Sequence, residues 1–389
     1  MTDNGTTGSG PPGGQADLPF LRPSLPATSQ VDAYFESSRR AGWFSNGGPC
    51  VSRLTSRITD MLPEGTGCAL VANGTLALAL ALRAAAGSPG DRREILLPSF
   101  TFAAVPAAVS WAGFEPVFVD VEAESWQMSP DSLERALSRR RERVAAVLAC
   151  STFGTMPPRR IREAWGQVCD EASLPMVVDS AAGFGSEGEE GERMGATGTA
   201  EIFSFHATKT FAIGEGGAVT SRDADLLARV RSLANFGFDS DRIVESEVGL
   251  NAKMSEWSAA TGLALLDGFE EIVEHRRAQS RAIVEAAEGL GYSAQPGSES
   301  SAWQFVPLMA PTGAARQRVL ELAPERKIGV RTYFDPPLHR MPGFAAIESE
   351  DPLVATDELA SRTISLPMSN QMTDDEVARV VGLLEESAR

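Results

Sequence analysis

Short runs of almost entirely apolar residues recur between residues 68 and 180, and helix-length segments separate them. The runs are CALVANG (68–74), ILLP (95–98), PVFVDV (116–121), VAAVLAC (144–150) and PMVVDS (175–180). The segments between them are TLALALALRAAA (75–86), TFAAVPAAVSWAG (101–113), SPDSLERAL (129–137) and RRIREAWGQVCDEA (159–172). Strands without polar alternation are covered on both faces, and strands linked by helices run parallel. The pattern predicts an α/β fold with a mostly parallel sheet between helical layers.

Two further strands are predicted in AEIFSFH (200–206) and GGAVTS (216–221). A loop rather than a helix joins them, which suits an antiparallel pair at an edge of the sheet. A long helical stretch at 254–290 then leads to a smaller α+β region. We expect strands there near 302–308, 328–334 and 364–368, and a final helix at 373–387 that begins with a capping box of Thr373 and Glu376.

The chain of 389 residues is too long for one compact core. We therefore expect a large domain over residues 18–270 and a small C-terminal domain over 271–389. Residues 1–17 are rich in Gly, Ser, Thr and Pro and are predicted to form a disordered tail.

Composition excludes several classes of protein. The formal net charge of −17 disfavours binding to nucleic acid or to an anionic membrane surface. No apolar run approaches the roughly 18–20 residues of a membrane span, and the N-terminus lacks the features of a signal peptide. Four cysteines show no metal-ligand spacing, so we expect no metal site and a reducing cytoplasm as the location.

Ligands of open parallel sheets bind at the carboxyl ends of the strands, and three polar features, the third of them Lys209, fall there. Asn73-Gly74-Thr75 ends the first strand and opens a helix. It suits either a phosphate held by backbone N–H groups and the Thr75 hydroxyl or a plain turn with a threonine cap. Asp179 ends an apolar strand, where a carboxylate is costly unless it is paired. A metal ligand, a catalytic acid or base, the partner of a cationic ring nitrogen and a helix cap all remain open for it.

Lys209 is one of only three lysines in the chain, and it lies in FSFHATKTFAIGEGGAV (203–219). A sheltered lysine that loses its proton attacks carbonyl carbons; the bland alternative is a solvated loop lysine. A phosphate turn, an acid and a nucleophilic lysine together are what pyridoxal 5'-phosphate requires. The sequence lacks the GxxxxGK[ST] of a P-loop and the GxGxxG of a dinucleotide site.

The sequence also resembles the DegT/DnrJ/StrS family of pyridoxal-phosphate-dependent sugar aminotransferases, which have the fold-type I architecture of aspartate aminotransferase. The resemblance extends from about Leu18 to near the C-terminus. The matching stretches are AGWFSNGGP (41–49), ANGTLAL (72–78), ILLPSFTFAAVPAAV (95–109), PVFVDVE (116–122), FGTMPP (153–158), VVDSAAGFGS (177–186), FSFHATKTFAIGEGGAVTS (203–221), GLNAKMSEWSAATGLALLDGF (249–269), PPLH (336–339) and ISLP (364–367).

The resemblance assigns roles to individual residues. It implies that Lys209 is the Schiff-base lysine, that Asp179 pairs with the pyridine nitrogen, and that Phe102 stacks on the pyridine ring. The cofactor phosphate is expected to bind Gly74, Thr75 and Ser204 of one subunit and Asn251 of its neighbour in a homodimer with shared active sites. The predicted substrate-binding residues are Glu215 and His339, of which the latter is otherwise a surface or core histidine. For His206 a packing role and a role in the site are given equal weight.

Two stretches depart from the family pattern. The family often has Asp-Ala-Ala followed by Gln or His, whereas this chain has Asp179-Ser180-Ala181-Ala182. It also often has His ahead of the Phe-Gly pair, whereas this chain has Cys150-Ser151-Thr152 there. Relatives that act as sugar dehydratases have His in place of the Schiff-base lysine, so Lys209 favours transamination.

The expected function is an aminotransferase of amino-sugar biosynthesis. It would move an amino group from an amino acid, L-glutamate being the expected donor, to a nucleotide-linked 3- or 4-keto-deoxyhexose, with pyridoxamine 5'-phosphate as the form of the cofactor between half-reactions. Arginines are expected to hold the nucleotide diphosphate, and Arg331 is one candidate. The alternatives are a keto-cyclitol or another non-nucleotide keto substrate, and a non-catalytic family member that binds cofactor or sugar.

Overall fold

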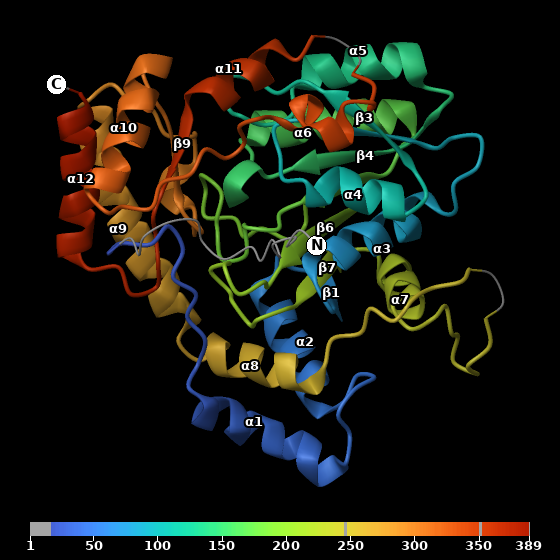
Figure 1. Cartoon of the computed structure of the whole chain (residues 1–389). Coiled ribbons are helices and arrows are strands. Elements are labelled where there is room, and N and C mark those ends of the chain that lie inside the picture. Colours follow the sequence, from blue (N-terminus) through green and yellow to red (C-terminus); the bar gives the residue numbers. More distant parts are fainter. Residues whose placement is uncertain (1–16, 245–246, 350–351, 389) are drawn as a thin grey trace, which may run out of the picture.

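The computed structural model describes residues 17–244, 247–349 and 352–388, and within them a seven-stranded sheet forms the centre of the protein (Figure 1). Its strands are β1 (Gly67–Val71), β2 (Glu94–Pro98), β3 (Glu115–Val119), β4 (Val144–Cys150), β5 (Met176–Asp179), β6 (Ala200–Ser204) and β7 (Gly217–Ser221). Their spatial order is β1-β7-β6-β5-β4-β2-β3. Every neighbouring pair is parallel except those that β7 makes with β1 and β6, which confirms the mostly parallel sheet.

The predicted place of β7 is wrong. The strand is antiparallel as expected, but it lies inside the sheet, because β1 pairs with its other side from Gly67↔Ser221 to Val71↔Gly217. About 150 residues separate the two strands in the chain, so no local pattern in the sequence announces this pairing. The pairing brings Gly217 against Asn73, where a Cβ on Gly217 would lie 2.8 Å from the Asn73 carbonyl carbon.

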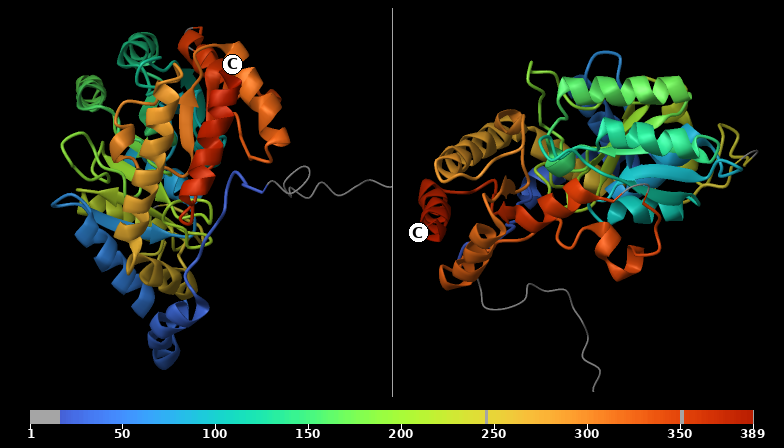
Figure 2. Two further views of the ribbon diagram at one scale, coloured as in Figure 1. Left: turned by 90° about the vertical axis from the view of Figure 1, so that its left-hand side faces the viewer. Right: turned by 90° about the horizontal axis from the view of Figure 1, so that it is seen from above.

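Helices cover both faces of the sheet (Figures 1 and 2). One face packs against α3 (Gly74–Ala86), α4 (Ala104–Trp111) and α7 (Ala224–Leu233), and the other against α5 (Pro130–Arg140), α6 (Arg159–Ala172), α2 (Pro49–Met61) and α8 (Glu256–Leu266). Successive strand residues serve opposite cores: Leu97 packs with the first set of helices and Leu96 with α5 and α6. The all-apolar strands of the sequence are thus explained by burial on both faces.

Helix α1 (Thr28–Ala41) is attached to this body through a buried carboxylate on α8. Glu256 is fully buried and accepts hydrogen bonds from the Ser38 hydroxyl at 2.6 Å and from the N–H groups of Cys50 and Val51 at 2.6 and 3.1 Å. The last two belong to the first turn of α2, where the helix dipole favours a negative charge. One side chain therefore joins α1, α2 and α8.

The C-terminal residues build a second core around a two-stranded sheet. Its elements are α9 (Phe269–Glu288), β8 (Val306–Met309), α10 (Gly313–Glu325), β9 (Thr363–Leu366) and α12 (Asp374–Ser387), whereas α11 (Val354–Arg362) packs in a separate cluster. Short 3₁₀ turns occur at Thr152–Gly154, Ser298–Ser300, Leu338–Arg340 and Pro342–Phe344. Helices α9, α10 and α12 gather at one end of the protein, whereas α11 lies near β3 (Figure 1). The predicted domain boundary at residue 270 stays a prediction.

Several local predictions can be compared with these elements. The capping box of Thr373 and Glu376 is confirmed. The predicted helix at 254–290 is broken into α8 and α9 at Asp267–Gly268. The predicted strand at 328–334 is wrong, since this segment makes only isolated bridges, from Ile328 to Leu18 and from Arg331 to Ser365.

The predicted tail at 1–17 lies outside the described residues except for Asp17, whose carboxylate is 3.6 Å from the Lys327 amine. Among the described helices, none combines the length and the apolar character that a membrane span requires.

Candidate active site

The carboxyl ends of β4, β5 and β6 and the start of α3 open onto one cavity of about 800 Å³. Predicted site residues from distant parts of the chain meet there. They are Gly74, Thr75, Phe102, Asp179, Ser204, Lys209 and Glu215. The cavity therefore collects all three parts of the expected cofactor site: the phosphate turn, the acid and the lysine.

The phosphate end of this site depends on Gly74, which has no side chain. A Cβ on Gly74 would lie 2.7 Å from Cβ of Ser204, so only glycine lets the end of β6 approach the first turn of α3. The helix is capped by Asn73, whose Oδ1 accepts the N–H of Leu76 at 2.9 Å. The first N–H groups of α3 have no partner within the helix, and they lie beside the Ser204 hydroxyl. An anion fits between them.

Asp179 lies at the end of β5 and is 8% exposed. Within the described part of the chain only the N–H of Ala181 donates a hydrogen bond to its carboxylate, at 2.9 Å. Burial raises its pKa from 3.8 to about 6, while that hydrogen bond and the nearby charge of Lys209 act in the opposite direction. A buried acid with so few donors is suited to a cation supplied by a ligand.

Lys209 lies three residues beyond His206 in a tight turn, in which the Lys209 N–H donates to the His206 carbonyl at 2.9 Å. Burial lowers the pKa of its amine from 10.5 to about 8, and the charge of Asp179 partly offsets this shift. A substantial fraction of the amine is thus unprotonated near neutral pH, as a nucleophile requires.

His206 and Glu215 also line the cavity. His206 Nε2 lies 3.7 Å from Glu215 Oε1, and both side chains are about half exposed. The Nδ1 atom of His206 lies 2.9 Å from the Thr208 hydroxyl. His206 is therefore a cavity residue and not a core packing residue.

Two predicted site residues lie outside the cavity lining. Asn251 is exposed, and its Oδ1 accepts a hydrogen bond from the Lys253 amine at 2.7 Å. The neighbouring Ala252 carbonyl accepts the N–H of Ala72 at 2.7 Å, so this segment runs beside the end of β1. A role for Asn251 in the site of a second subunit is compatible with its exposure and stays a prediction.

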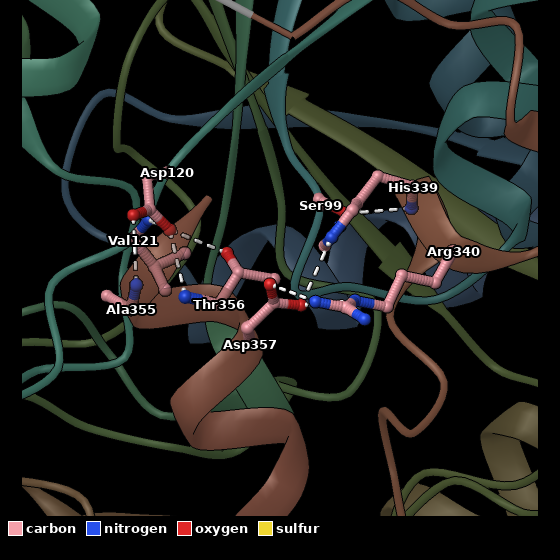
Figure 3. Close-up of polar contacts among 8 residues, drawn as sticks. All are labelled: Ser99, Asp120, Val121, His339, Arg340, Ala355, Thr356 and Asp357. Atoms are coloured by element: carbon pink, nitrogen blue, oxygen red, sulfur yellow. Dashed lines mark hydrogen bonds and ion pairs between the residues drawn. The ribbon is translucent and has the colours of Figure 1, made fainter. Parts of the chain in front are cut away.

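His339 is the other residue outside the cavity, and both of its ring nitrogens have protein partners (Figure 3). Nδ1 lies 2.9 Å from the Ser99 hydroxyl, and Nε2 lies 3.1 Å from Asp357 Oδ1. Beside them Asp120, at the end of β3, accepts the N–H groups of Ala355 and Thr356 at the start of α11. The two groups of contacts form a latch, defined here as Ser99, Asp120, His339, Thr356 and Asp357, that holds α11 against the ends of β2 and β3.

Sequence reasoning missed much of the cavity wall. Leu21, Gln304, Phe305, Tyr333 and Phe334 all line it. These residues come from the N-terminal segment and from the C-terminal core, and none belongs to a motif with recognisable chemistry. Their only signal is the aromatic character of three of them.

The residues present fit pyridoxal 5'-phosphate. The glycine at the start of α3 leaves room for a phosphate, and Lys209 has a lowered pKa. Among the residues that the structure describes, no cationic side chain is in contact with Asp179. Phe102, 57% exposed, stands at the cavity as a flat apolar surface for a ring. Among the described residues no group of three or more His, Cys, Asp or Glu is placed to hold a metal ion.

Comparisons with known proteins agree with this chemistry. The model of the DegT/DnrJ/EryC1/StrS aminotransferase family matches residues 27–385. A Mycobacterium tuberculosis protein, Rv3402c, is 38% identical over 97% of this chain and 92% of its own length. The dTDP-4-amino-4,6-dideoxy-D-glucose transaminase of Escherichia coli is 27% identical over 94% of this chain and 98% of its own. The crystal structure of DesI with its TDP-sugar product superposes with a TM-score of 0.85, at 32% identity, over 97% of this chain and 95% of that one.

The raised pKa of Asp179 makes the ligand-free protein less stable as the pH rises. A carboxyl group whose pKa is about 6 in the folded protein and 3.8 when unfolded binds its proton more tightly in the folded state, so stability falls between about pH 4 and 6. We expect Asp179→Asn to stabilise the cofactor-free protein by about 3 kcal/mol at pH 7 and to have little effect at pH 4. Denaturant unfolding at the two pH values measures this.

Asp357→Asn supplies the opposite control. The pKa of Asp357 is lowered below 3.8, mainly by the hydrogen bond from Arg340. The ionised Asp357 carboxylate therefore stabilises the protein above about pH 4, and this contribution is lost on acidification. The Asn variant should therefore be less stable than the parent at pH 7. Equal destabilisation by both substitutions would contradict the account of Asp179.

The placement of His339 predicts an effect on stability and not on substrate binding. His339→Ala leaves the Ser99 hydroxyl and the Asp357 carboxylate without this partner, so we expect a loss of about 1–2 kcal/mol in unfolding free energy. Its KM for the sugar should change less than two-fold, a change that corresponds to about 0.4 kcal/mol. A large increase in KM at unchanged stability would instead support the sugar contact implied by the family resemblance.

Proposed function

This chain belongs to the DegT/DnrJ/EryC1/StrS aminotransferase family, and we propose that it transfers the amino group of L-glutamate to a nucleotide-linked 3- or 4-keto-deoxyhexose. That it is a pyridoxal-phosphate-dependent sugar aminotransferase follows from the family. The sugar, the ring carbon and the amino donor are our proposal. Relatives named for dTDP- and TDP-sugars support the nucleotide-linked class of substrate.

The convergence of Lys209 and Asp179 in one cavity carries this proposal. Bound cofactor supplies an electron-accepting ring that stabilises negative charge on the carbon next to the transferred nitrogen. The Asp179 carboxylate would face the ring nitrogen and favour its protonated form. The N–H groups of Gly74 and Thr75 and the hydroxyl of Ser204 would donate hydrogen bonds to the phosphate.

Lys209 would both hold the cofactor and move the proton. Its amine, with a pKa of about 8, gives up and takes back a proton near neutral pH, as a general base and acid must. The same Nζ atom serves the half-reaction with the amino donor and the half-reaction with the keto sugar, so we expect ping-pong kinetics. Glu215 and His206 line the cavity with partly exposed polar side chains, which can bind sugar hydroxyls.

Arg331 is our candidate for the diphosphate. Its side chain is exposed, with the guanidinium carbon 5.7 Å from the centre of the Phe20 ring. Two residues further on, Tyr333 lines the cavity. Within the described residues the Arg331 guanidinium donates only to its neighbour's carbonyl, at Val330, so it remains available for a phosphate oxygen.

We also propose a homodimer with shared active sites. Several large apolar side chains are exposed, among them Phe44 (55%), Trp257 (45%), Phe236 (44%) and Val248 (82%). Phe44 and Trp257 both contact Phe35 through ring edges or tilted faces, so they form one patch around α1 and α8. Exposed apolar patches of this kind mark interfaces. Asn251 lies near one of these side chains, because the Lys253 amine that donates to it also lies over the Phe236 ring.

A covalent-trapping assay tests the role of Lys209. Borohydride treatment of the cofactor-loaded wild-type protein should fix the cofactor irreversibly on Lys209 and bleach the visible absorption band. The absorption spectrum follows the band, and mass spectrometry of the peptides locates the attachment. We expect Lys209→Ala to lose the attachment and at least about 10³-fold in turnover. Lys327→Ala, which changes an exposed lysine, is the matched control and should behave like the wild type.

The same assay separates the candidate substrates. Glutamate and a panel of a nucleotide-linked keto-deoxyhexose, the free keto sugar and a keto-cyclitol are supplied, and formation of 2-oxoglutarate is followed. Our proposal expects turnover with the nucleotide-linked sugar alone. A Lys209→Ala protein with full activity, or equal rates with the free sugar, would contradict it.

Mixed dimers test the shared active site. Lys209→Ala should be nearly inactive, and Asn251→Ala should bind the cofactor more weakly at every site of its own homodimer, so the assay uses a cofactor concentration at which Asn251→Ala is mostly unloaded. When the two variants are co-expressed, mixed dimers contain one site with both groups intact, so we expect about a quarter of wild-type activity in the random mixture. A monomer by light scattering, or no recovery of activity on mixing, would rule out this arrangement.

A further inference from the structure

Two hydrogen-bonded serine side chains lead from the cavity to a buried carboxylate. Ser151 lines the cavity, and its hydroxyl oxygen lies 2.8 Å from that of Ser180. The Ser180 hydroxyl in turn donates to Oε1 of Glu201. Their exposed fractions are 5% for Ser151, 0% for Ser180 and 1% for Glu201. We call this set the serine relay; the site described above uses none of its members.

The carboxylate at the inner end fixes the direction of donation. Glu201 Oε2 accepts the N–H groups of Gly195 at 2.8 Å and of Thr197 at 3.0 Å, and backbone N–H groups can only donate. Three donors thus converge on Glu201. Burial raises its pKa, and the hydrogen bonds from Ser180, Thr197 and Gly195 oppose that rise by stabilising the charged form.

The direction then passes outward through the two serines. Because the Ser180 proton is committed to Glu201, the Ser180 oxygen can only accept from Ser151. The Ser151 proton is committed in turn to Ser180, so the Ser151 oxygen can take part in further hydrogen bonds only as an acceptor, through its lone pairs. A serine hydroxyl usually rotates freely between donor and acceptor roles, but this one is held as an acceptor.

The relay is also fixed to the part of the sheet that carries the candidate catalytic acid. The Ser151 N–H donates to the Asp179 carbonyl at 2.9 Å, and the Ser180 N–H donates to the Ile202 carbonyl at 3.0 Å. Ser180 directly follows Asp179 in the chain, so β4, β5 and β6 together set the position of both hydroxyls. The acceptor therefore has a fixed place relative to Asp179.

We propose that Ser151 is a specificity-determining residue that accepts a hydrogen bond from a ligand hydroxyl in the cavity, with Ser180 and Glu201 as positioning residues. The inference rests on the proposed function, since the ligand is either the cofactor, through its ring hydroxyl, or the sugar, through one of its own. An acceptor backed by a buried negative charge favours a protonated hydroxyl over an ionised oxygen or a carbonyl.

The test uses the full-length protein and the variants Ser151→Ala, Ser180→Ala and Glu201→Gln. Ser365→Ala is the matched control, because its hydroxyl is buried without a hydrogen-bond partner in the described part of the chain and lies outside the cavity lining. Three quantities are measured: the Kd of pyridoxal 5'-phosphate for the cofactor-free protein, the single-turnover rate with glutamate, and the KM of the keto-sugar substrate.

We expect Ser151→Ala and Ser180→Ala each to weaken one ligand about five- to ten-fold, the usual effect of one hydrogen bond, and the double variant to be no weaker than either. A larger Kd for the cofactor with a slower glutamate half-reaction identifies the ring hydroxyl. An unchanged Kd and half-reaction with a larger KM identifies a sugar hydroxyl. Glu201→Gln should reproduce the same pattern, and if it does not fold the serine variants decide alone.

Variants of both serines that match Ser365→Ala in all three quantities would overturn the inference while the wild type remained an active aminotransferase. If Ser151→Ala changed any of these quantities and Ser180→Ala changed none, the role of Ser180 and Glu201 in orienting Ser151 would be overturned. A wild-type protein that binds no cofactor is a different result, because it removes the proposed function itself.

Discussion

The protein must hold two ionisable groups, Asp179 and Lys209, together at one cavity where they have limited contact with water, and much of the structure follows from that requirement. Burial favours the neutral form of each group, so it raises the pKa of Asp179 to about 6 and lowers the pKa of Lys209 to about 8. Each group is then ready to change its charge when a ligand arrives. The mostly apolar strands of the sheet offset this cost, because they hold β5 tightly between β4 and β6 and allow little relaxation.

The sequence predicts the chemistry of the site better than the walls of the cavity. Asp179 and Lys209 stand out because a charged residue after an apolar strand is unusual, and the ends of parallel strands meet at one edge. Tyr333 and Phe334 reach the same cavity from a segment with no strand and no motif. Their position depends on contacts between distant segments, as does the insertion of β7 beside β1, and single-sequence patterns contain no information on such pairs.

The serine relay illustrates the same limit at the level of two residues. Ser151 and Ser180 lie in two stretches that depart from the family pattern, and along the chain they appear as unrelated changes. In the structure their hydroxyls are in contact, and Glu201 supplies the charge that orients both. Asp120 and Glu256 act in a comparable way. Each is a carboxylate that accepts N–H groups from a helix start elsewhere in the chain, which joins elements that no turn connects.

The latch at α11 has a consequence for how such an enzyme can change its substrate. Helix α11 runs directly into β9, and Ser365 of β9 pairs with Arg331, two residues before the cavity residue Tyr333. Asp120 at the end of β3 therefore helps to set the position of the part of the cavity wall that contains Tyr333. The latch joins the C-terminal region to residues that follow β2 and β3. We therefore expect new specificity to arise from exchanges between relatives that carry both partners of the latch together.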